Sequence, residues 1–389
     1  MRPLIEYILA RSDLDLFEKG VPWRFLNYMD TSIADRRKLT LTRDRLTEIL
    51  HRCKAKRVAV IGDFCLDAYW YADMTKSELS RETPRFPLPI VKEVYSPGGA
   101  GNVALNLTAL GLRTVLGITV FGLDWRGELL RKALLDQGIC LDFSLSLPGK
   151  VTPAYIKPML QGYASIQEDS RLDFGPVPLS KEDEEALLKS IGDCIPEADV
   201  IAIADQVTPG VITPNVRAML TELSRRYPEK LFVVDSRKNV GDFSNMIVKP
   251  NELEALKACG MGSNSADIPT MRQAAARLHE RTSKPVFVTL GENGALLIED
   301  SIFYLLPGVA VEPPVDIVGA GDTFLSALCA SLAGGASPWE AGMIANLASS
   351  VTVKKLNTTG TASPEEILAR YDSIRSEWKA EVWDEPHVR

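Results

Sequence analysis

The chain has 389 residues, of which 46% are hydrophobic and 24% charged, so it can bury a sizeable core. Its net charge of −7 argues against a nucleic-acid partner, and no apolar stretch is long enough to cross a membrane. Six scattered cysteines indicate buried thiols in a reducing compartment, and three histidines offer little for zinc or triad chemistry. We therefore expect a cytoplasmic globular protein without nucleic-acid or membrane partners.

The two ends of the chain differ in composition from its body. Residues 1–55 are charged and partly amphipathic, and the pattern over 41–50 predicts a helix. We expect 1–55 to be a helical N-terminal extension that packs on the body or joins an oligomer interface. Residues 381–389 have the composition of a loose tail, and we place a C-terminal tail at 376–389. Residues 56–375 are then expected to form one domain.

The body alternates short apolar runs with helical patterns. The runs predict buried strands at 57–62, 115–120, 200–204, 231–234, 247–248 and 286–290. The helical patterns between them are 102–110, 126–135, 181–191, 214–226, 252–258 and 270–281. Such alternation predicts an α/β protein whose mostly parallel central sheet has helices on both faces. The alternation of apolar runs and helical patterns is interrupted by two segments rich in Pro, aromatic and β-branched residues, about 69–96 and 143–174.

The most informative segment is Asp316-Ile-Val-Gly-Ala-Gly-Asp-Thr-Phe324, in which two glycines precede Asp322 and a helical pattern over 323–332. Backbone N–H groups at a helix N-terminus, with the positive end of the helix dipole, attract phosphate. The groups concerned belong to Gly319, Ala320 and Gly321. A carboxylate beside them can act as the base for a hydroxyl that attacks a phosphoryl group. The alternative is that Asp322 only caps the helix.

A second glycine cluster is Pro97-Gly-Gly-Ala-Gly-Asn-Val-Ala-Leu-Asn-Leu-Thr-Ala-Leu-Gly111. Together the two motifs resemble the N- and C-terminal signatures of the ribokinase-like carbohydrate kinases of the phosphofructokinase-B type. The resemblance covers roughly residues 57–372. It implies a three-layer α/β/α sandwich with a small β lid, formed by the two interrupting segments, through which a homodimer is expected. It also implies ATP and Mg²⁺ as cofactors and a sugar or sugar phosphate as the small-molecule partner.

The sugar side of the cleft is predicted from Gly62-Asp-Phe-Cys-Leu-Asp67, which follows the first strand. Open α/β sheets bind ligands at the carboxyl ends of their strands. The resemblance assigns Asp67 to substrate hydroxyls, from which a carboxylate can accept hydrogen bonds. It assigns a second wall to Gly98, Gly99 and Asn102, where glycines admit close approach and the amide both donates and accepts. Asp63 remains open between a ligand contact and a turn cap.

Several segments resemble the heptose-7-phosphate kinase branch of that family. They are the short spacing between Gly98 and Asn102, the segment 62–71, Leu79-Ser-Arg-Glu-Thr-Pro84, Arg171-Leu-Asp-Phe174 and the segment 354–364. One departure is Asp205-Gln-Val-Thr-Pro-Gly210, where the branch usually carries a lysine. Lys157 or Arg171 could supply that positive charge, although Arg171 could equally pair with Asp173.

The nucleotide side is predicted from two further motifs. Lys249-Pro-Asn-Glu-Leu-Glu254 matches the family's Asn-x-x-Glu through Asn251 and Glu254, whose oxygens suit Mg²⁺. The same spacing also fits a capping box. By resemblance, Thr289, Gly291 and Gly294 border ATP, and Asn346 lies near adenine. In isolation these residues fit a hairpin and a helix-surface asparagine.

The sequence therefore predicts an ATP-dependent kinase that transfers the γ-phosphoryl group to a hydroxyl of a sugar phosphate, as heptose-7-phosphate kinases do. One alternative is another carbohydrate or nucleoside kinase of the same family. A second is a non-catalytic sugar-binding regulator on the same fold. The presence of Asp322, Asn251 and Glu254 argues against the regulator, because a binding protein needs no base.

Overall fold

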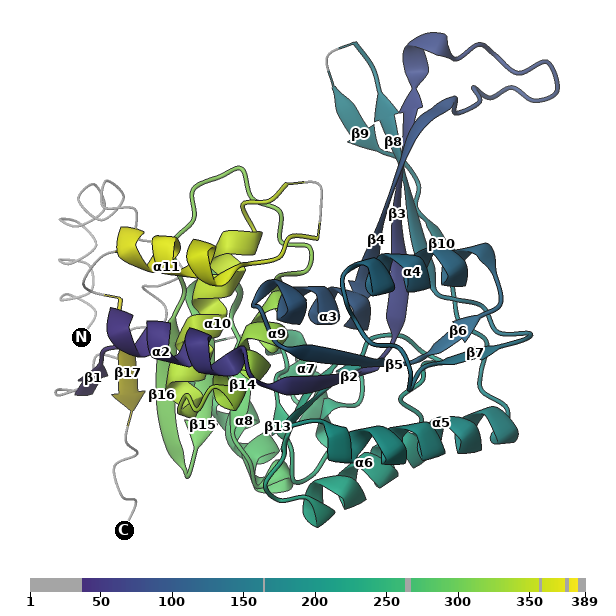
Figure 1. Ribbon diagram of the computed structural model, residues 1–389. Helices are drawn as coiled ribbons and strands as arrows, with labels where there is room; N and C mark the ends of the chain where they lie inside the picture. The colour runs from purple at the N-terminus through teal and green to yellow at the C-terminus, as the bar shows by residue number, and fades with distance from the viewer. Residues whose placement is uncertain (1–36, 164, 263–266, 357–358, 375–377, 384–389) are drawn as a thin grey trace, which may run out of the picture.

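The structure is a computed structural model that describes residues 37–163, 165–262, 267–356, 359–374 and 378–383 (Figure 1). A ten-stranded sheet forms its centre. In spatial order the strands are β1 (Arg37–Leu39), β17 (Ala380–Trp383), β16 (Ile302–Pro307), β15 (Gly294–Glu299), β14 (Val286–Thr289), β13 (Ile247–Val248), β12 (Leu231–Ser236), β11 (Val200–Asp205), β2 (Arg57–Gly62) and β5 (Thr114–Ile118). Neighbours from β5 to β14 are parallel, whereas those from β14 to β1 are antiparallel.

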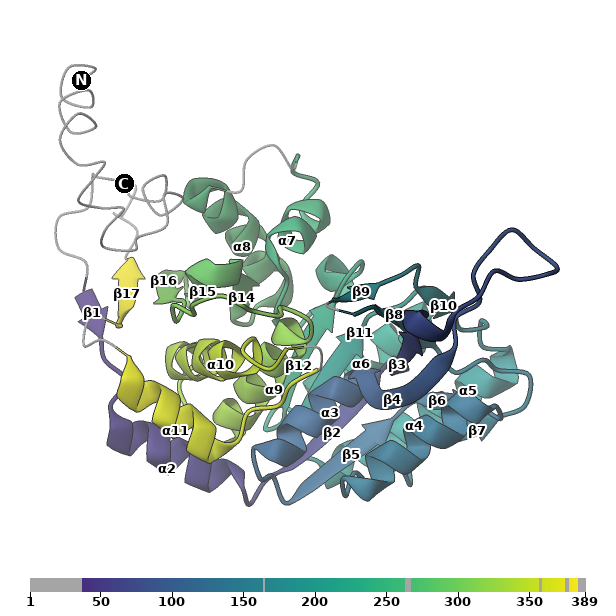
Figure 2. The ribbon, with the colours of Figure 1, turned by 90° about the horizontal axis from the view of Figure 1, so that it is seen from above.

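Helices cover both faces of this sheet (Figure 2). One face carries α2 (Arg43–Cys53), α3 (Ala100–Ala109), α4 (Trp125–Asp136), α9 (Ala320–Ala333), α10 (Pro338–Thr352) and α11 (Pro364–Ser373). The other carries α5 (Lys181–Cys194), α6 (Pro214–Arg226), α7 (Glu252–Ala258) and α8 (Ile268–Thr282). Successive strand side chains point to opposite faces, so Val60 of β2 enters the first core and Ile61 the second. The predicted three-layer α/β/α sandwich is confirmed.

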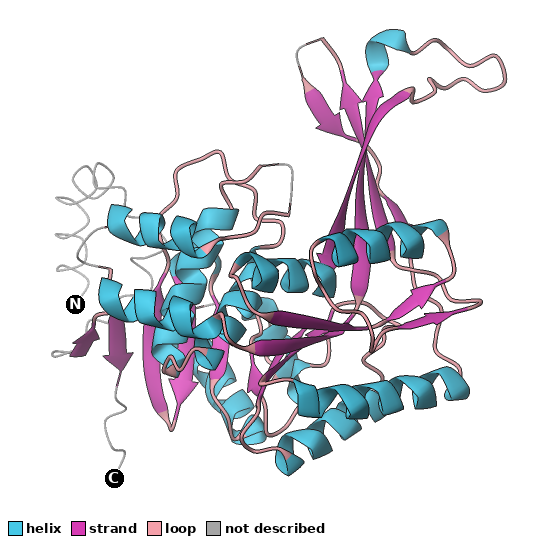
Figure 3. Cartoon of the chain, viewed as in Figure 1, coloured by secondary structure: helices cyan, strands magenta, loops and turns pink. Residues whose placement is uncertain are grey.

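A smaller sheet projects from the body (Figure 3). Its strands are β3 (Phe64–Asp73), β4 (Ile90–Gly99), β8 (Ala154–Gln161), β9 (Ile166–Glu168) and β10 (Leu172–Phe174). β3 pairs antiparallel with β4 and parallel with β8, and β8 also pairs with β9 and β10. These strands form the predicted β lid. The early part of segment 143–174 does not join it, because β7 (Leu145–Leu147) pairs with β6 (Val120–Gly122). Short 3₁₀ helices occur at Met74–Lys76, Ile195–Glu197, Val240–Asp242 and Gly291–Asn293.

Both ends of the described chain join the body. Strand β17 pairs with β16 and β1, so the expected loose tail over 381–389 is wrong for residues 381–383. The reason is that their backbone groups complete the antiparallel edge of the main sheet. At the other end, α2 packs its apolar face on α9 and α11, which favours the body over an oligomer interface. Residues 1–36 and 384–389 lie outside the described residues.

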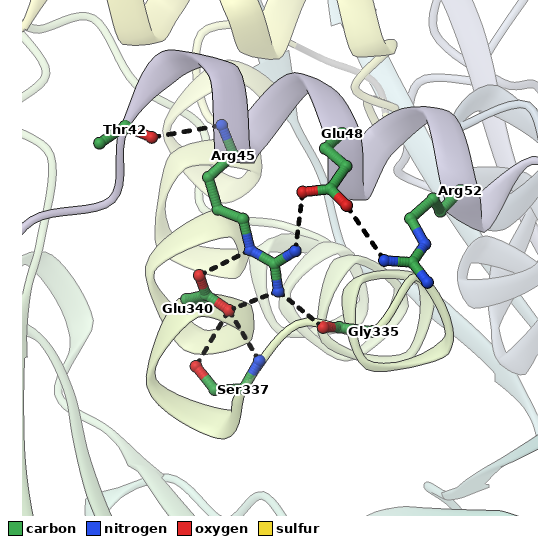
Figure 4. Close-up of polar contacts among 7 residues, drawn as sticks. All are labelled: Thr42, Arg45, Glu48, Arg52, Gly335, Ser337 and Glu340. Carbon is green, nitrogen blue, oxygen red and sulfur yellow. Dashed lines mark hydrogen bonds and ion pairs between the residues drawn. The ribbon is translucent and has the colours of Figure 1, made fainter.

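An ion pair connects α2 to the first turn of α10 (Figure 4). Arg45 donates to both carboxylate oxygens of Glu340, at 2.9 and 3.1 Å, and to the carbonyl of Gly335 at 2.7 Å. Glu340 also accepts from the backbone N–H of Ser337 at 2.8 Å. Only 11% of the Glu340 side chain is exposed, so these bonds are poorly screened by solvent. Arg45 therefore ties α2 to the N-terminus of α10 and to the turn that precedes it.

Replacing Arg45 with methionine should lower the free energy of unfolding by about 2–3 kcal/mol, because Glu340 would keep its charge without its main partner. Arg52→Met is the matched control. Arg52 lies on the same helix and pairs with Glu48, but 57% of its side chain is exposed. That change should cost less than about 0.5 kcal/mol. Chemical denaturation of both variants checks this, and equal losses would contradict it.

The remaining sequence expectations concern cysteines and membranes. None of the six cysteines forms a disulfide, and five of them are buried. Among the described helices, none combines the length and apolar character that crossing a bilayer requires.

Candidate active site

Asp322 lies in the first turn of α9, behind the left-handed residue Gly319, whose φ is +80°. The amide of Asn102, from α3, donates to Oδ2 of Asp322 at 2.9 Å. A side chain at Gly319 would place its Cβ only 2.7 Å from the same amide nitrogen. Glycine is therefore needed at position 319 both for its backbone angle and for the approach of Asn102. The two glycine motifs, far apart in the sequence, meet at this contact.

The orientation of the Asn102 amide is fixed by a short chain of hydrogen bonds. Asn106 donates from Nδ2 to Oδ1 of Asn102 at 3.1 Å and to its carbonyl at 3.0 Å. Thr323 in turn donates its hydroxyl to Oδ1 of Asn106 at 3.2 Å. Because Oδ1 of Asn102 already accepts a bond, its NH₂ group faces Asp322. Asn106 and Thr323 were not predicted, since both read as ordinary helix residues.

Asp322 has the electrostatic character of a base that works near neutral pH. Part of the residue remains accessible, but protein atoms surround its carboxylate, and this burial raises its pKa to about 7. The Asn102 hydrogen bond and Lys249 oppose the rise, whereas Asp235 and Asp67 add to it. A carboxylate with such a pKa can take a proton from a hydroxyl and still be substantially ionised at pH 7.

Asp67 lies on β3 at the base of the lid, opposite Ser96 of β4. A Cβ at Gly98 would fall 2.5 Å from Oδ2 of Asp67, so the glycine makes room for this carboxylate. Gly99 has φ +55° and caps α3. Burial raises the pKa of Asp67, while Lys157 and Arg171 hold it down. The structure thus brings Asp67, Gly98 and Asn102 together beside Asp322.

The N-terminus of α9 offers fewer free backbone donors than the sequence suggested. Ala320 already donates its N–H to the carbonyl of Ile317 at 3.2 Å. The N–H groups of Gly321 and Asp322 belong to the first helical turn, which has no intrahelical acceptor. Of the predicted trio 319–321, Ala320 is therefore engaged, and the N–H groups of Gly321 and Asp322 are the donors in the first turn of α9 that can meet an anion.

A buried ion pair beside this turn was not predicted. Lys249, at the end of β13, lies 3.0 Å from Asp235 of β12, and their side chains are 3% and 9% exposed. A Cβ on Gly321 would be 3.8 Å from the Lys249 ammonium, so the cation adjoins the helix N-terminus. Burial opposes the charge of Lys249, but Asp235, Glu254 and Asp322 together raise its pKa. Their position in the sequence could have identified them, because each residue comes at the carboxyl end of a buried apolar run, where open α/β sheets bind ligands.

Asn251 and Glu254 form a reciprocal capping box at the start of α7. Asn251 Oδ1 accepts from the N–H of Glu254 at 2.9 Å, and Glu254 Oε2 accepts from the N–H of Asn251 at 2.8 Å. The capping alternative is therefore confirmed as local structure. Burial and Asp235 raise the pKa of Glu254. The capping bonds leave Oε1 of Glu254 and the second lone pair of Asn251 Oδ1 available for a further partner.

These oxygens fit Mg²⁺ in the manner usual for nucleotide sites. Among the described residues, no three His, Cys, Asp or Glu side chains are grouped to hold a metal by themselves. Mg²⁺ in phosphoryl-transfer sites commonly uses one or two carboxylates plus phosphate oxygens and water. A single acid in this position, with Asp235 nearby, meets that requirement when phosphates are present.

The predicted nucleotide residues separate into two groups. Thr289 pairs with Asn251 in a β-bridge, and a Cβ added to Gly291, whose φ is +58°, would meet no atom within 4 Å. By contrast, a Cβ on Gly294 would collide with the Leu306 carbonyl at 2.1 Å, so the fold itself requires that glycine. Asn346 is 7% exposed and donates to the Leu306 carbonyl at 3.0 Å. It is a buried support of β16 and not a helix-surface residue.

Asp63 is a structural residue in this arrangement. Its carboxylate accepts backbone N–H groups of Gln206, Val207 and Val211 at 2.8–2.9 Å. Burial raises its pKa to about 6, although these three bonds oppose the rise. The turn-cap alternative is thus confirmed, and Asp63 holds the loop after β11 against β2.

The two cations proposed for the lid differ in their surroundings. Lys157 is 9% exposed and donates to the hydroxyl of Tyr69 at 3.1 Å. Its positive charge also lowers the pKa of Asp67. Arg171 makes a two-bond ion pair with Asp173, at 2.6 and 2.7 Å, with both side chains about half exposed. The alternative pairing of Arg171 is therefore the one observed. Lys157 is the cation better sheltered from solvent.

Comparison with known proteins places this geometry in context. A family model described as pfkB family carbohydrate kinase matches residues 55–366, which begins just after α2. Bifunctional protein HldE of Geotalea uraniireducens is 31% identical over 346 residues, covering 88% of this chain and 68% of the relative. HldE of Caulobacter sp. is 31% identical over 331 residues, covering 83% and 64%. The chain thus spans about two thirds of the length of these relatives.

Solved structures share the fold at low sequence identity. Escherichia coli phosphofructokinase-2, in complex with substrates and products, aligns with TM-score 0.64 at 20% identity, covering 82% of this chain and 98% of that one. Arabidopsis thaliana ribokinase, complexed with ribose and ATP, aligns with TM-score 0.60 at 19% identity, covering 81% and 98%. At these identities the likeness establishes the fold.

Proposed function

This chain belongs to the pfkB family of carbohydrate kinases, and we propose that it phosphorylates a sugar that already carries phosphate, in a heptose-7-phosphate kinase-like reaction. ATP is the phosphoryl donor that such a kinase implies. The choice of a heptose phosphate is supported by the similarity to the HldE proteins over most of this chain. Whatever the remaining third of those relatives does is not assigned to this protein.

One observation carries the proposal: Asp322, with a pKa of about 7, lies between the sugar-side residues and a helix N-terminus with an adjoining cation. A hydroxyl held near Asp67 and Asn102 would give its proton to Asp322 as it attacks phosphorus. The bond between the γ-phosphorus and the bridging oxygen of ATP would break, and ADP would leave with the negative charge. The proton stays on the carboxylate until solvent removes it.

The negative charge on the transferring phosphoryl group would be stabilised by groups at the N-terminus of α9. The N–H groups of Gly321 and Asp322 and the ammonium of Lys249 can act together on the equatorial oxygens. Mg²⁺, when bound with ATP, would neutralise phosphate charge, and Asn251 and Glu254 are the residues proposed to hold it. Thr289, Gly291 and Gly294 are proposed to line the nucleotide, with Asn346 supporting the adenine end from beneath.

The lid is proposed to recognise the substrate's own phosphate and to mediate a homodimer. Lys157 and Arg171 are the lid cations that hold down the pKa of Asp67, so their fields reach the sugar site. Exposed apolar side chains on the lid strands support a partner there, among them Val91, Ile166 and Leu172.

A panel of acceptors with ATP tests the proposed function. Heptose 7-phosphate should give the highest kcat/KM, above fructose phosphates, and well above ribose, adenosine and the unphosphorylated heptose. The physical reason is that a phosphate dianion gains charge-assisted hydrogen bonds that a hydroxyl cannot, worth about 10- to 100-fold. A clear preference for free sugars or adenosine would move the protein to another branch of the family. Turnover of none of these acceptors would favour the sugar-binding regulator.

A further inference from the structure

The two carboxylate oxygens of Asp322 have different surroundings. Oδ2 accepts a hydrogen bond from the amide of Asn102 at 2.9 Å. Among the described residues, none donates a hydrogen bond to Oδ1. Part of Asp322 remains accessible, so Oδ1 is the oxygen that a substrate hydroxyl can meet without breaking a bond within the protein.

A backbone carbonyl decides which way round the Asn102 amide lies. Nδ2 of Asn106 donates to the carbonyl of Asn102 at 3.0 Å, and a carbonyl can only accept. The same nitrogen lies 3.1 Å from the end of the Asn102 side chain, so the atom it meets there has to be the oxygen, Oδ1. Asn102 must then present its nitrogen to Asp322. The Thr323 hydroxyl, which donates to Oδ1 of Asn106 at 3.2 Å, agrees with this orientation.

The hydrogen-bond chain lies in the buried contact between α3 and α9. Asn102, Asn106 and Thr323 are 0%, 1% and 1% exposed. A second polar link joins the same helices, because Ser326 donates its hydroxyl to the carbonyl of Val103 at 3.0 Å. Turning the Asn102 amide over would leave buried polar atoms without partners, which is costly. The amide is therefore held in one orientation.

We propose that Asn106 is a positioning residue that keeps the NH₂ group of Asn102 toward Oδ2 of Asp322, and that Oδ1 of Asp322 is therefore the atom that receives the proton. This inference rests on the role of Asp322 as the base, proposed above. As the hydroxyl oxygen attacks the γ-phosphorus, its O–H bond would break and a bond from that proton to Oδ1 would form. The bond from phosphorus to the bridging oxygen would break, and ADP would leave. A proton on Oδ2 would face the N–H group of Asn102, which cannot accept it.

The fixed amide also keeps Asp322 ionised before the reaction. An amide that could turn would offer its oxygen to a protonated carboxyl group and its nitrogen to a carboxylate, whereas the fixed amide stabilises the carboxylate alone. Removing Asn106 should therefore stabilise the protonated form of Asp322 and raise its pKa. The other titratable groups that act on Asp322 stay in place in such a variant; they are Asp235 of β12, Lys249 at the end of β13, and Asp67 and Cys65 of β3.

Asn106→Leu tests this role through the pH profile of kcat, measured with the best acceptor of the panel above and saturating ATP. The rising limb should move from about 7 to about 7.5–8, because protonated Asp322 gains one neutral hydrogen bond. kcat should then be about 3- to 10-fold below wild type at a pH of about 6, and close to wild type at a pH of about 9. Thr108→Val is the matched control, since this hydroxyl donates within α3, to the carbonyl of Ala104 at 3.1 Å. Its limb should stay at about 7.

Thr323→Val is a second variant that changes the packing less than Asn106→Leu does. It should shift the limb in the same direction but by less, because the carbonyl of Asn102 still orients Asn106. Thr323→Ser, which keeps the hydroxyl, should shift the limb less than Thr323→Val. If Asn106 acts through Asn102, adding Asn106→Leu to Asn102→Ala should cause no further shift, since the amide is already gone.

The inference is overturned by a limb that stays at about 7 in both Asn106→Leu and Thr323→Val, or by a loss of kcat that is equal at every pH. An undiminished shift when Asn106→Leu is added to Asn102→Ala would also overturn it. Asp322→Asn separates these failures from failure of the proposed base. If Asp322→Asn loses turnover while Asn106→Leu keeps the wild-type limb, only the role of Asn106 is wrong. If Asp322→Asn keeps both turnover and limb, the base fails and the inference with it.

Discussion

Asp322→Asn should lower kcat by about 10²- to 10⁴-fold, the usual scale for loss of a general base. Asparagine has nearly the same shape and can still meet the amide of Asn102, but it cannot take a proton from the attacking hydroxyl. ATP binding should survive, because the anion site proposed for its phosphates uses backbone N–H groups and Lys249. Steady-state kinetics with heptose 7-phosphate measures the loss. Asp193→Asn, an exposed residue of α5, is the control and should retain wild-type turnover.

The pH dependence of kcat provides a second test of the role of Asp322 as the base. In the wild type, kcat should rise with pH through about 7 and then level off, because only ionised Asp322 accepts the proton. The residual activity of Asp322→Asn should lack this limb. Near wild-type turnover in the variant, or a limb that persists in it, would remove Asp322 from the mechanism.

The same pKa predicts that Asp322→Asn does not weaken the fold. The folded-state pKa lies above the ordinary value of 3.8, so burial favours the protonated form. The wild type therefore loses stability as pH rises from that ordinary value through about 7, where the buried carboxylate ionises, whereas asparagine stays neutral. At a pH of about 8, above the folded-state pKa, the variant should melt no lower than the wild type. This separates a catalytic loss from misfolding.

Asp67→Ala should raise KM for the sugar about 100-fold, because charge-assisted hydrogen bonds to two hydroxyls are lost together. KM for ATP should remain nearly unchanged, since Asp67 lies on lid strand β3, while the groups proposed for the nucleotide and its metal lie at the N-termini of α7 and α9 and on β14 and β15. Initial rates with each substrate varied in turn provide the measurement.

Glu78→Ala is the control for Asp67, since it removes an exposed carboxylate from the same lid. It should leave both KM values near those of the wild type. If ATP affinity fell in Asp67→Ala while sugar affinity held, the division of the cleft into a sugar side and a nucleotide side would be wrong.

The sequence alone determined the layers of this protein and identified part of its candidate site. The alternation of apolar runs and helical patterns predicted the α/β sandwich, because a strand buried on both faces must be apolar throughout. The position of Asp322 behind a glycine turn that opens a helix predicted it as a candidate base, and the resemblance of the second glycine motif to a family signature predicted Asn102. Lid segments were recognisable because their aromatic and Pro-rich composition breaks the alternation.

The tertiary structure decided which of these residues act together. The contact between Asn102 and Asp322 joins helices more than two hundred residues apart, and no local pattern encodes such a pairing. Lys249 and Asp235 become a buried ion pair only because β13 and β12 are neighbours in the sheet. The pKa of Asp322 likewise depends on burial by surrounding elements. Composition predicted a loose end at 381–383, but hydrogen bonds to β16 made it a strand, because edge pairing depends on partners and not on local propensity.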